Sequence, residues 1–187
     1  MGDIQTLPIV PIIGEAIVLR QFTETDIPTV YATCNDIEIQ RWLPLRSPYE
    51  LSDAHFFVNE FAIKAQSSGD GIVFAVEVNN HLVGAIDISG SSWSNRHCGI
   101  GYWAVPAHRG NGHMTSALKL LSHWVIHEQG FQRVEIFVGL ENYASQKVAE
   151  RAGFIREGIS RNKAVLRGSR IDVVLYSKIP TDLDHKL

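Results

Sequence analysis

Apolar and polar positions along the 187-residue chain follow two periods, and their order predicts the elements of the fold. The helical period, in which one face of the segment is apolar, occupies residues 23–34, 36–42, 51–66, 115–128 and 142–151. Short apolar or alternating runs, which favour strands, occupy residues 16–20, 72–78, 82–89, 96–105, 133–138, 154–159 and 170–179.

This order of elements predicts a single α+β (mixed α/β) domain over residues 14–180. Its helices are expected to flank a central, twisted and mostly antiparallel sheet of about seven strands. Residues 1–13, which include Pro8 and Pro11, are expected to form an irregular N-terminal lead, and residues 181–187 a C-terminal tail.

The segment Arg109-Gly110-Asn111-Gly112-His113-Met114 joins the predicted strand 96–105 to the predicted helix 115–128. The first N–H groups of a helix have no partner inside the helix, and the helix dipole favours negative charge there. Glycine lets the backbone approach such an anion closely. The turn therefore predicts a site for a phosphate-bearing ligand beside the end of a strand.

Composition narrows the partners of this site. A net charge of −3 and a pI of about 6.2 give no broad cationic surface, so nucleic acid is not the expected main partner. Cys34 and Cys98 have no neighbours at metal-ligand spacing, which favours a reduced, cytoplasmic setting and no structural metal. No secretory signal or membrane span is evident, and the loose myristoylation match of residues 1–6 is taken as chance.

Three other functional motifs are not supported by the sequence around them. Residues 99–104 match a dinucleotide-binding fingerprint, but Tyr102 and Trp103 lie inside a strand pattern where no helix opens. His123 and His127 are one helical turn apart but lack a third metal ligand, so a solvated helix flank is expected. The chain contains no Gly-x-Ser-x-Gly elbow, the usual signature of a hydrolase nucleophile.

Three further segments connect the glycine turn with a known family. Ile100-Gly101-Tyr102-Trp103 precedes it, Asn142-Tyr143-Ala144-Ser145 follows the next strand, and residues 152–158 read Ala-Gly-Phe-Ile-Arg-Glu-Gly. With these motifs the chain, over about residues 14–180, resembles the GNAT superfamily of N-acetyltransferases. It looks like the RimJ/RimL-type branch, which modifies N-terminal amines of ribosomal proteins. Met114 departs from the family's signature, which has a small residue at that position.

The resemblance implies a fold, a cosubstrate and roles for several residues. The fold would be of the GNAT type, and the cosubstrate acetyl-CoA, with its pyrophosphate bound by backbone N–H groups of the glycine turn. Val105 would offer a backbone N–H to the oxyanion, and Ser145 would protonate the leaving thiolate. Asn142 and Ser145 can equally serve only the start of their helix. The implied cofactor contacts are Trp103, Ala104, Val105, Arg109, Gly110, Asn111, Gly112, His113, Met114 and Asn142.

The general base is not identified by these motifs. Related enzymes carry a carboxylate at positions that correspond to Gly99 or Ala164 here, and neither residue can accept a proton. Substitutes are Asp87, His97 and Glu135, or a chain of water molecules. A base-poor site favours an α-amine, with a pKa of about 7.7–8.0, over a lysine, with a pKa of about 10.4.

The leading hypothesis is therefore direct transfer of acetyl from acetyl-CoA to a primary amine, in particular the N-terminal α-amine of a ribosomal or other protein. The alternatives are a small-molecule acceptor, such as a polyamine, amino acid or antibiotic, or a CoA-binding regulatory domain without catalysis. We expect the acceptor site to involve the N-terminal helices and residues 42–49, 90–95 and 162–169. A homodimer is also open, and Trp93 in a polar loop would suit its contact surface.

Overall fold

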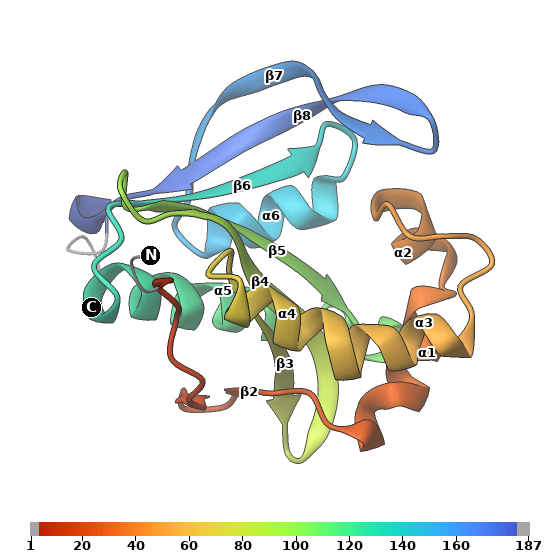
Figure 1. Ribbon diagram of the computed structural model, residues 1–187. Helices are drawn as coiled ribbons and strands as arrows, with labels where there is room; N and C mark the ends of the chain where they lie inside the picture. Colours follow the sequence, from red (N-terminus) through yellow and green to blue (C-terminus); the bar gives the residue numbers. More distant parts are fainter. Residues whose placement is uncertain (1–3, 183–187) are drawn as a thin grey trace.

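A computed structural model describes residues 4–182 of the chain, and these residues form one mixed α/β unit around a single sheet (Figure 1). Eight strands lie in the order β1-β2-β3-β4-β5-β6-β8-β7, and every neighbouring pair is antiparallel except β5 and β6. The strands are β1 (Ile12–Ile13), β2 (Val18–Arg20), β3 (Ile72–Val78), β4 (His81–Ser92), β5 (His97–Ala104), β6 (Arg133–Gly139), β7 (Ile155–Leu166) and β8 (Ser169–Lys178).

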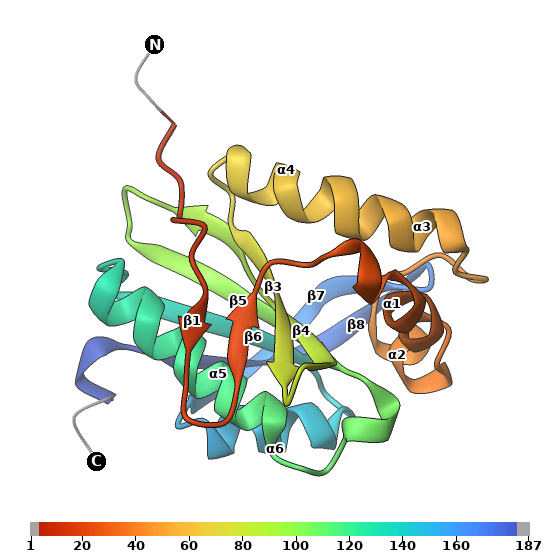
Figure 2. The same cartoon turned by 90° about the horizontal axis from the view of Figure 1, so that it is seen from below.

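Two groups of helices cover the sheet, one on each face (Figure 2). One face carries α5 (His113–His123), which a π-helical turn at Trp124–Glu128 extends, and α6 (Tyr143–Arg151). The other face carries α1 (Ile27–Cys34), α2 (Ile37–Trp42), α3 (Leu51–Phe56) and α4 (Ala62–Ser67). A π-helical turn at Phe57–Phe61 joins α3 to α4, so the chain runs as one long helix there.

Strand alternation sends side chains to two separate cores. Ile86, Ile88 and Ile100 point toward α5 and α6 and belong to the larger apolar cluster. Ala75 of β3 points the opposite way and packs with Ala54 of α3 in the smaller cluster. A residue's position in the strand therefore tells which face of the sheet its side chain serves.

The parallel pair β5–β6 is short, and its two strands separate before either ends. Pairing extends only from His97–Arg133 to Gly99–Glu135, although β5 continues to Ala104 and β6 to Gly139. Beyond Gly99, the edge of β5 that faces β6 therefore has no neighbouring strand, while the other edge stays paired with β4. This gap in the middle of the sheet is the position around which the candidate site is built.

The expected domain is confirmed in class, with eight strands in place of about seven. The N-terminal lead differs from the expectation, because Ile12 and Ile13 form β1 against β2 and Leu7 is buried in the larger core. Its first three residues, part of the myristoylation match, and residues 183–187 of the predicted tail lie outside the described residues. Within the described part, no helix is long and apolar enough to cross a membrane.

Trp93 does not form the exposed contact surface that its polar loop suggested. Its indole N–H donates to the carbonyl oxygen of Gly69 over 2.9 Å, and its ring meets the edge of Phe131 with centroids 5.4 Å apart. The side chain therefore serves the larger core, on which it is packed.

Candidate active site

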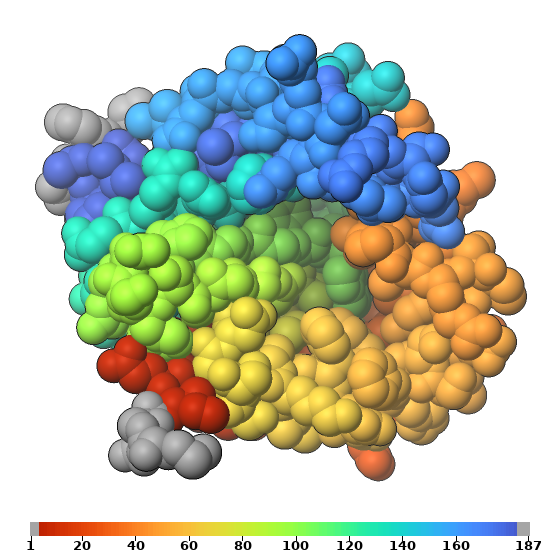
Figure 3. Space-filling view, turned by 45° about the horizontal axis from the view of Figure 1, so that its top comes forward, coloured from red at the N-terminus to blue at the C-terminus, as the bar shows by residue number. Residues whose placement is uncertain are grey.

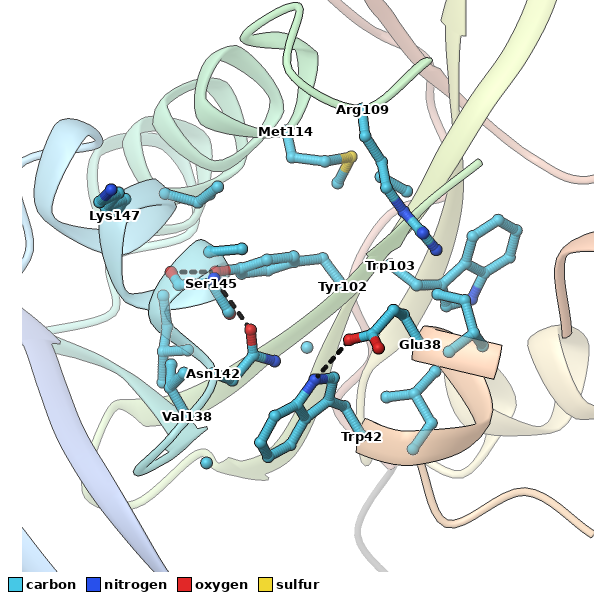
Figure 4. Close-up of a pocket in the computed structure, with 18 of the residues that line it drawn as sticks. Glu38, Trp42, Tyr102, Trp103, Arg109, Met114, Val138, Asn142, Ser145 and Lys147 are labelled. Atoms are coloured by element: carbon cyan, nitrogen blue, oxygen red, sulfur yellow. Dashed lines mark hydrogen bonds between the residues drawn. The ribbon is translucent and has the colours of Figure 1, made fainter. Parts of the chain in front are cut away.

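A cavity of about 570 Å³ occupies the gap between β5 and β6. Figure 4 shows α2 on one side of it, α6 on the other, and the N-terminus of α5 above. The lining includes Ile100–Ala104 of β5, Ile136–Gly139 of β6 and residues of the glycine turn. The cavity therefore joins the predicted anion site to the unpaired edge of β5.

The glycine turn adopts a backbone conformation that favours glycine. Gly110 and Gly112 have φ of 82° and 80°, in the left-handed region, and a Cβ at either would meet nothing within 4 Å. The first backbone bond of α5 runs from Ser116 N–H to the Gly112 carbonyl over 3.0 Å. The N–H groups of His113, Met114 and Thr115 therefore have no partner inside the helix, and all three residues line the cavity.

Met114, which departs from the family's signature, fits this turn because of a glycine on a neighbouring strand. Its side chain is buried, with 7% exposed, and its sulfur lies 2.8 Å from the place that a Cβ on Gly84 would occupy. The thioether thus packs over β4, and the Met114 backbone N–H remains at the start of the helix. The larger side chain takes up core space beside β4.

Basic side chains surround the cavity on the glycine-turn side. Arg109 and His113 come from the turn region, and Lys147 and Arg151, one turn apart, come from α6. The Arg109 guanidinium lies 2.6 Å from a carboxylate oxygen of Asp36, which also caps α2. Desolvation raises the pKa of Asp36, but hydrogen bonds from Arg109 and two backbone N–H groups outweigh it, so the pKa is lowered. This ion pair ties the turn to α2.

The expected role of Val105 is wrong in its detail. Its N–H donates to the Val83 carbonyl over 2.9 Å, so it is committed to β4 and cannot face an oxyanion. Because N–H groups alternate along an antiparallel strand, those of Tyr102 and Ala104 point toward the gap instead. These two residues line the cavity, whereas Val105 and Asn111 are absent from the lining.

A pair of hydroxyl groups from two elements meets at the cavity wall. The Ser145 Oγ and the Tyr102 Oη are 2.7 Å apart, and the tyrosine hydroxyl also donates to the Ser145 carbonyl over 3.0 Å (Figure 4). Burial raises the pKa of Tyr102 to about 12, so the phenol stays protonated at neutral pH. Asn142 caps α6 by accepting the Ser145 N–H over 3.1 Å, and it lines the cavity as well.

Glu38 is the carboxylate that lines the cavity within the described residues. It lies on α2 beside Trp42, whose indole N–H donates to it over 3.3 Å, and Figure 4 shows its carboxylate directed toward the cavity. Trp103 stands behind it on β5. An acidic group next to two indole rings is an environment that attracts a cationic amine.

The three suggested substitutes for the general base differ in their surroundings. Glu135 is bound to Arg133 over 2.7 Å, and His97 lies at the start of β5, before the strands separate. Asp87 of β4 pairs with Gly101, which lines the cavity, and the side chain is partly exposed. Burial raises the pKa of Asp87 to about 6.

The acceptor elements expected from the sequence are only partly brought together. Trp42, Leu43 and Ala164 line the cavity. Arg167, at the tip of the β7–β8 hairpin, donates to the carbonyl oxygens of Gln40 and Leu45 and thereby joins the hairpin to the α2 region. Residues 90–95 lie at the far end of β4 and contribute nothing to the lining.

Several lining residues were not among the predicted site residues. Lys147 and Arg151 carry a signal that the sequence does contain, since two basic residues four apart share one face of a helix. Tyr102 also carries one, because it has a hydroxyl group within the otherwise apolar segment of residues 100–104 in β5. Glu38 has no such signal, since only the packing of α2 across the gap brings it to the cavity.

Comparison with known proteins agrees with this geometry. The family model described as Acetyltransferase (GNAT) domain matches residues 16–155. YoaA, an uncharacterized N-acetyltransferase of Bacillus subtilis, is 26% identical over 165 residues, which cover 87% of this chain and 93% of YoaA. The ribosomal-protein-serine acetyltransferase of Escherichia coli is 32% identical over 107 residues, which cover 57% of this chain and 60% of that protein.

A solved structure shows the same fold. RimJ of Mycobacterium smegmatis, in complex with CoA-disulfide, superimposes with a TM-score of 0.81 at 20% identity, covering 91% of this chain and 85% of that chain. The family model, together with the split sheet and the glycine turn, identifies an acyltransferase of the GNAT class. The chain belongs to the GNAT acetyltransferase family, is an N-acetyltransferase, and has RimJ/RimL-type ribosomal-protein acetyltransferases among its relatives.

Proposed function

We propose that this enzyme transfers the acetyl group of acetyl-CoA to the N-terminal α-amine of a protein. The observation that carries the proposal is the cavity between the separated strands β5 and β6. It combines a helix N-terminus and basic side chains, which suit phosphates, with an unpaired strand edge, which suits the amide groups of pantetheine.

Different residues of the cavity would bind different parts of acetyl-CoA. Free N–H groups of residues 113–115 would hold the pyrophosphate, and Lys147 and Arg151 lie within the same cavity to meet further phosphate charge. The unpaired edge of β5 would extend the sheet by pairing with pantetheine. The N–H of Tyr102 or Ala104 would then stabilise the oxyanion that forms on the acetyl carbonyl.

The chemical step moves one acetyl group and one proton. The amine nitrogen attacks the acetyl carbon, the C–N bond forms, and the C–S bond breaks as the tetrahedral intermediate collapses. The nitrogen loses a proton to a base, and the CoA sulfur gains one from an acid. In this proposal the Ser145 hydroxyl protonates the sulfur and regains a proton from the Tyr102 hydroxyl, 2.7 Å away, and Tyr102 is reprotonated from solvent.

One observation supports a cationic amine as the acceptor, and a second favours a protein N-terminus. Glu38, Trp42 and Trp103 offer a carboxylate and indole rings on the α2 side, where a cationic amine would first bind. A relative that is 32% identical over 107 residues bears the name ribosomal-protein-serine acetyltransferase. An α-amine also needs a weaker base than a lysine side chain does, by about two pKa units or more.

The test is thiol release from acetyl-CoA with a panel of acceptors. The panel contains peptides with a free N-terminus and no lysine, acetyl-blocked peptides with one lysine, and polyamines and amino acids. The proposal expects turnover with the first group, with the acetyl group located on the α-nitrogen by mass spectrometry. Turnover confined to small amines would overturn the protein acceptor, and binding of acetyl-CoA without turnover would support a regulatory domain.

A further inference from the structure

The sheet face opposite α5 and α6 contains a carboxylate, that of Asp87, beside the strand that borders the gap. Asp87 and Ala85 are two apart on β4, and their β5 partners are Gly101 and Trp103. Paired residues of neighbouring strands point to one face, and Trp103 packs on the α1–α3 side. Asp87 therefore lies on the face covered by α1–α4, where Figure 3 shows a hollow between the α3–α4 helix and the β7–β8 hairpin.

Gly101 allows the Asp87 carboxylate to lie over β5. A Cβ on Gly101 would stand 2.7 Å from the Asp87 Oδ1, closer than real Cβ atoms approach other atoms. The carboxylate thus occupies the space where a side chain of residue 101 would begin. Gly101 lines the cavity, and Asp87, which is not itself a lining residue, holds its carboxylate against Gly101, close to the point where β5 and β6 separate.

Other acidic groups on this face are already committed or lie elsewhere. Glu135, paired with Gly99 on the same face, receives the Arg133 Nε over 2.7 Å, and Arg133 in turn holds Glu157. Glu38 accepts from Trp42 and approaches from α2, with about half of its side chain exposed. Glu38 forms an ion pair with Arg41 and Glu135 forms one with Arg133, whereas Asp87 has no ion pair among the described residues.

The surroundings of Asp87 suit a base that works near neutral pH. Burial is the main cause that raises its pKa to about 6, and the carboxylate of Asp70 adds to the shift. The Ser89 hydroxyl and the Gly101 N–H oppose it by hydrogen bonding. A carboxyl group with this pKa is ionised at pH 7 yet more basic than an ordinary aspartate.

We infer that Asp87 is the general base of the reaction, taking the place of the carboxylates that Gly99 and Ala164 do not supply. Asp87 accepts the N–H proton of the attacking amine as the C–N bond forms, and passes it to solvent after the amide has formed. The acid on the α6 side protonates the sulfur independently, so each proton has one donor and one acceptor. The inference rests on the proposed acetyl transfer to an amine.

The first test replaces Asp87 by asparagine, which keeps the shape and removes the basic oxygen. Asp87→Asn should lower kcat by about 10²–10⁴-fold while acetyl-CoA affinity, measured by calorimetry, stays within threefold. In the wild-type enzyme, kcat should rise with pH around pH 6 as Asp87 ionises, and this rise should be absent from Asp87→Asn. Glu135→Gln is the matched control on the same sheet face, and it should keep both the rate and that rise.

A second pair of variants uses the close approach of Gly101. Gly101→Ala places a Cβ in the space of the carboxylate and should lower kcat by displacing it. Gly99→Ala, whose Cβ would lie 3.4 Å from the Ser89 carbonyl oxygen, should change kcat little. Because Gly99 shares the face of Gly101, the double variant Asp87→Asn/Gly99→Glu should regain part of the lost rate.

The outcomes separate the inference from the proposed function. An active wild-type enzyme whose Asp87→Asn variant keeps its kcat and its pH profile would overturn Asp87 and leave the acetyltransferase function intact. A wild-type protein that binds acetyl-CoA but acetylates no amine would overturn both. A ¹³C NMR titration of the carboxyl groups, assigned with Asp87→Asn, should find a pKa near 6, and a value near 4 would contradict the inference.

Discussion

Replacement of Gly112 tests the anion site at the start of α5. Gly112→Ala puts an L side chain at a φ of 80°, which costs about 1–2 kcal/mol of folding stability. Gly112→Asp adds the same backbone cost and a negative charge beside the pyrophosphate. At about 4 Å, two unit charges repel by about 1 kcal/mol in water and about 4 kcal/mol near a protein surface. The aspartate variant should therefore bind acetyl-CoA about fivefold to a thousandfold more weakly.

Gly130 provides a matched control for the backbone cost. It has a φ of 74°, a Cβ there would meet nothing within 4 Å, and it lies at the far end of the α5 helix, away from the cavity lining. Urea unfolding should show a loss of stability for Gly112→Asp no larger than that for Gly130→Asp, since the helix dipole favours a carboxylate at the helix N-terminus and disfavours one at the C-terminus. Calorimetry should show loss of acetyl-CoA affinity only for Gly112→Asp. Equal affinities for these two variants would refute the assignment of the pyrophosphate to this turn.

Three further predictions concern the hydroxyl pair, the core under the turn and the acceptor side. Ser145→Ala and Tyr102→Phe should each lower kcat more than they raise KM. Because the two hydroxyls act together, the double variant should lose less kcat than the product of the two single losses, and a loss equal to that product would contradict the pairing. Gly84→Ala should lower the free energy of unfolding by about 1–3 kcal/mol in urea denaturation, since its Cβ would meet the Trp103 carbonyl oxygen as well as the Met114 sulfur. Met114→Ala in the same chain should recover little of this loss, because it leaves the contact with the Trp103 carbonyl oxygen in place; recovery of most of the loss would contradict this reasoning. Glu38→Gln should raise KM for a cationic acceptor by at most about fivefold at low salt, since the side chain is half exposed, with kcat unchanged; an effect on acetyl-CoA binding instead would argue against an acceptor role.

The sequence predicted the regular elements where local signals were strong. The run 72–78 coincides with β3, and Asp36 and Asn142, each with an acceptor side chain, stand at the N-caps of α2 and α6. It missed β1, because two residues beside prolines carry no measurable period, and their strand pairing depends on β2. It also placed residues 90–95 near the acceptor, although β4 leads them to the opposite end of the sheet.

The site was predictable as far as it depends on backbone and local spacing. Positive φ values at Gly110 and Gly112 follow from the glycine turn, and these two residues line the cavity as expected. The predicted oxyanion contact at Val105 was wrong because its N–H points toward β4. Which N–H groups along β5 point toward β4 and which point toward the gap depends on the register between these two strands, which the sequence does not reveal. Tertiary packing alone brings Glu38 to the cavity and Asp87 over Gly101, so the sequence contains no signal for Glu38 and indicates Asp87 only as one of three substitute bases.

The central claim is tested most directly by comparing two peptides of identical composition as acceptors. One has a free N-terminus and an acetylated lysine side chain, and the other has an acetylated N-terminus and a free lysine. We expect kcat/KM at pH 7.5 to be at least tenfold higher for the free α-amine, and the acetyl group to be found on that nitrogen. Equal rates for both peptides, or a preference for the lysine, would contradict this expectation.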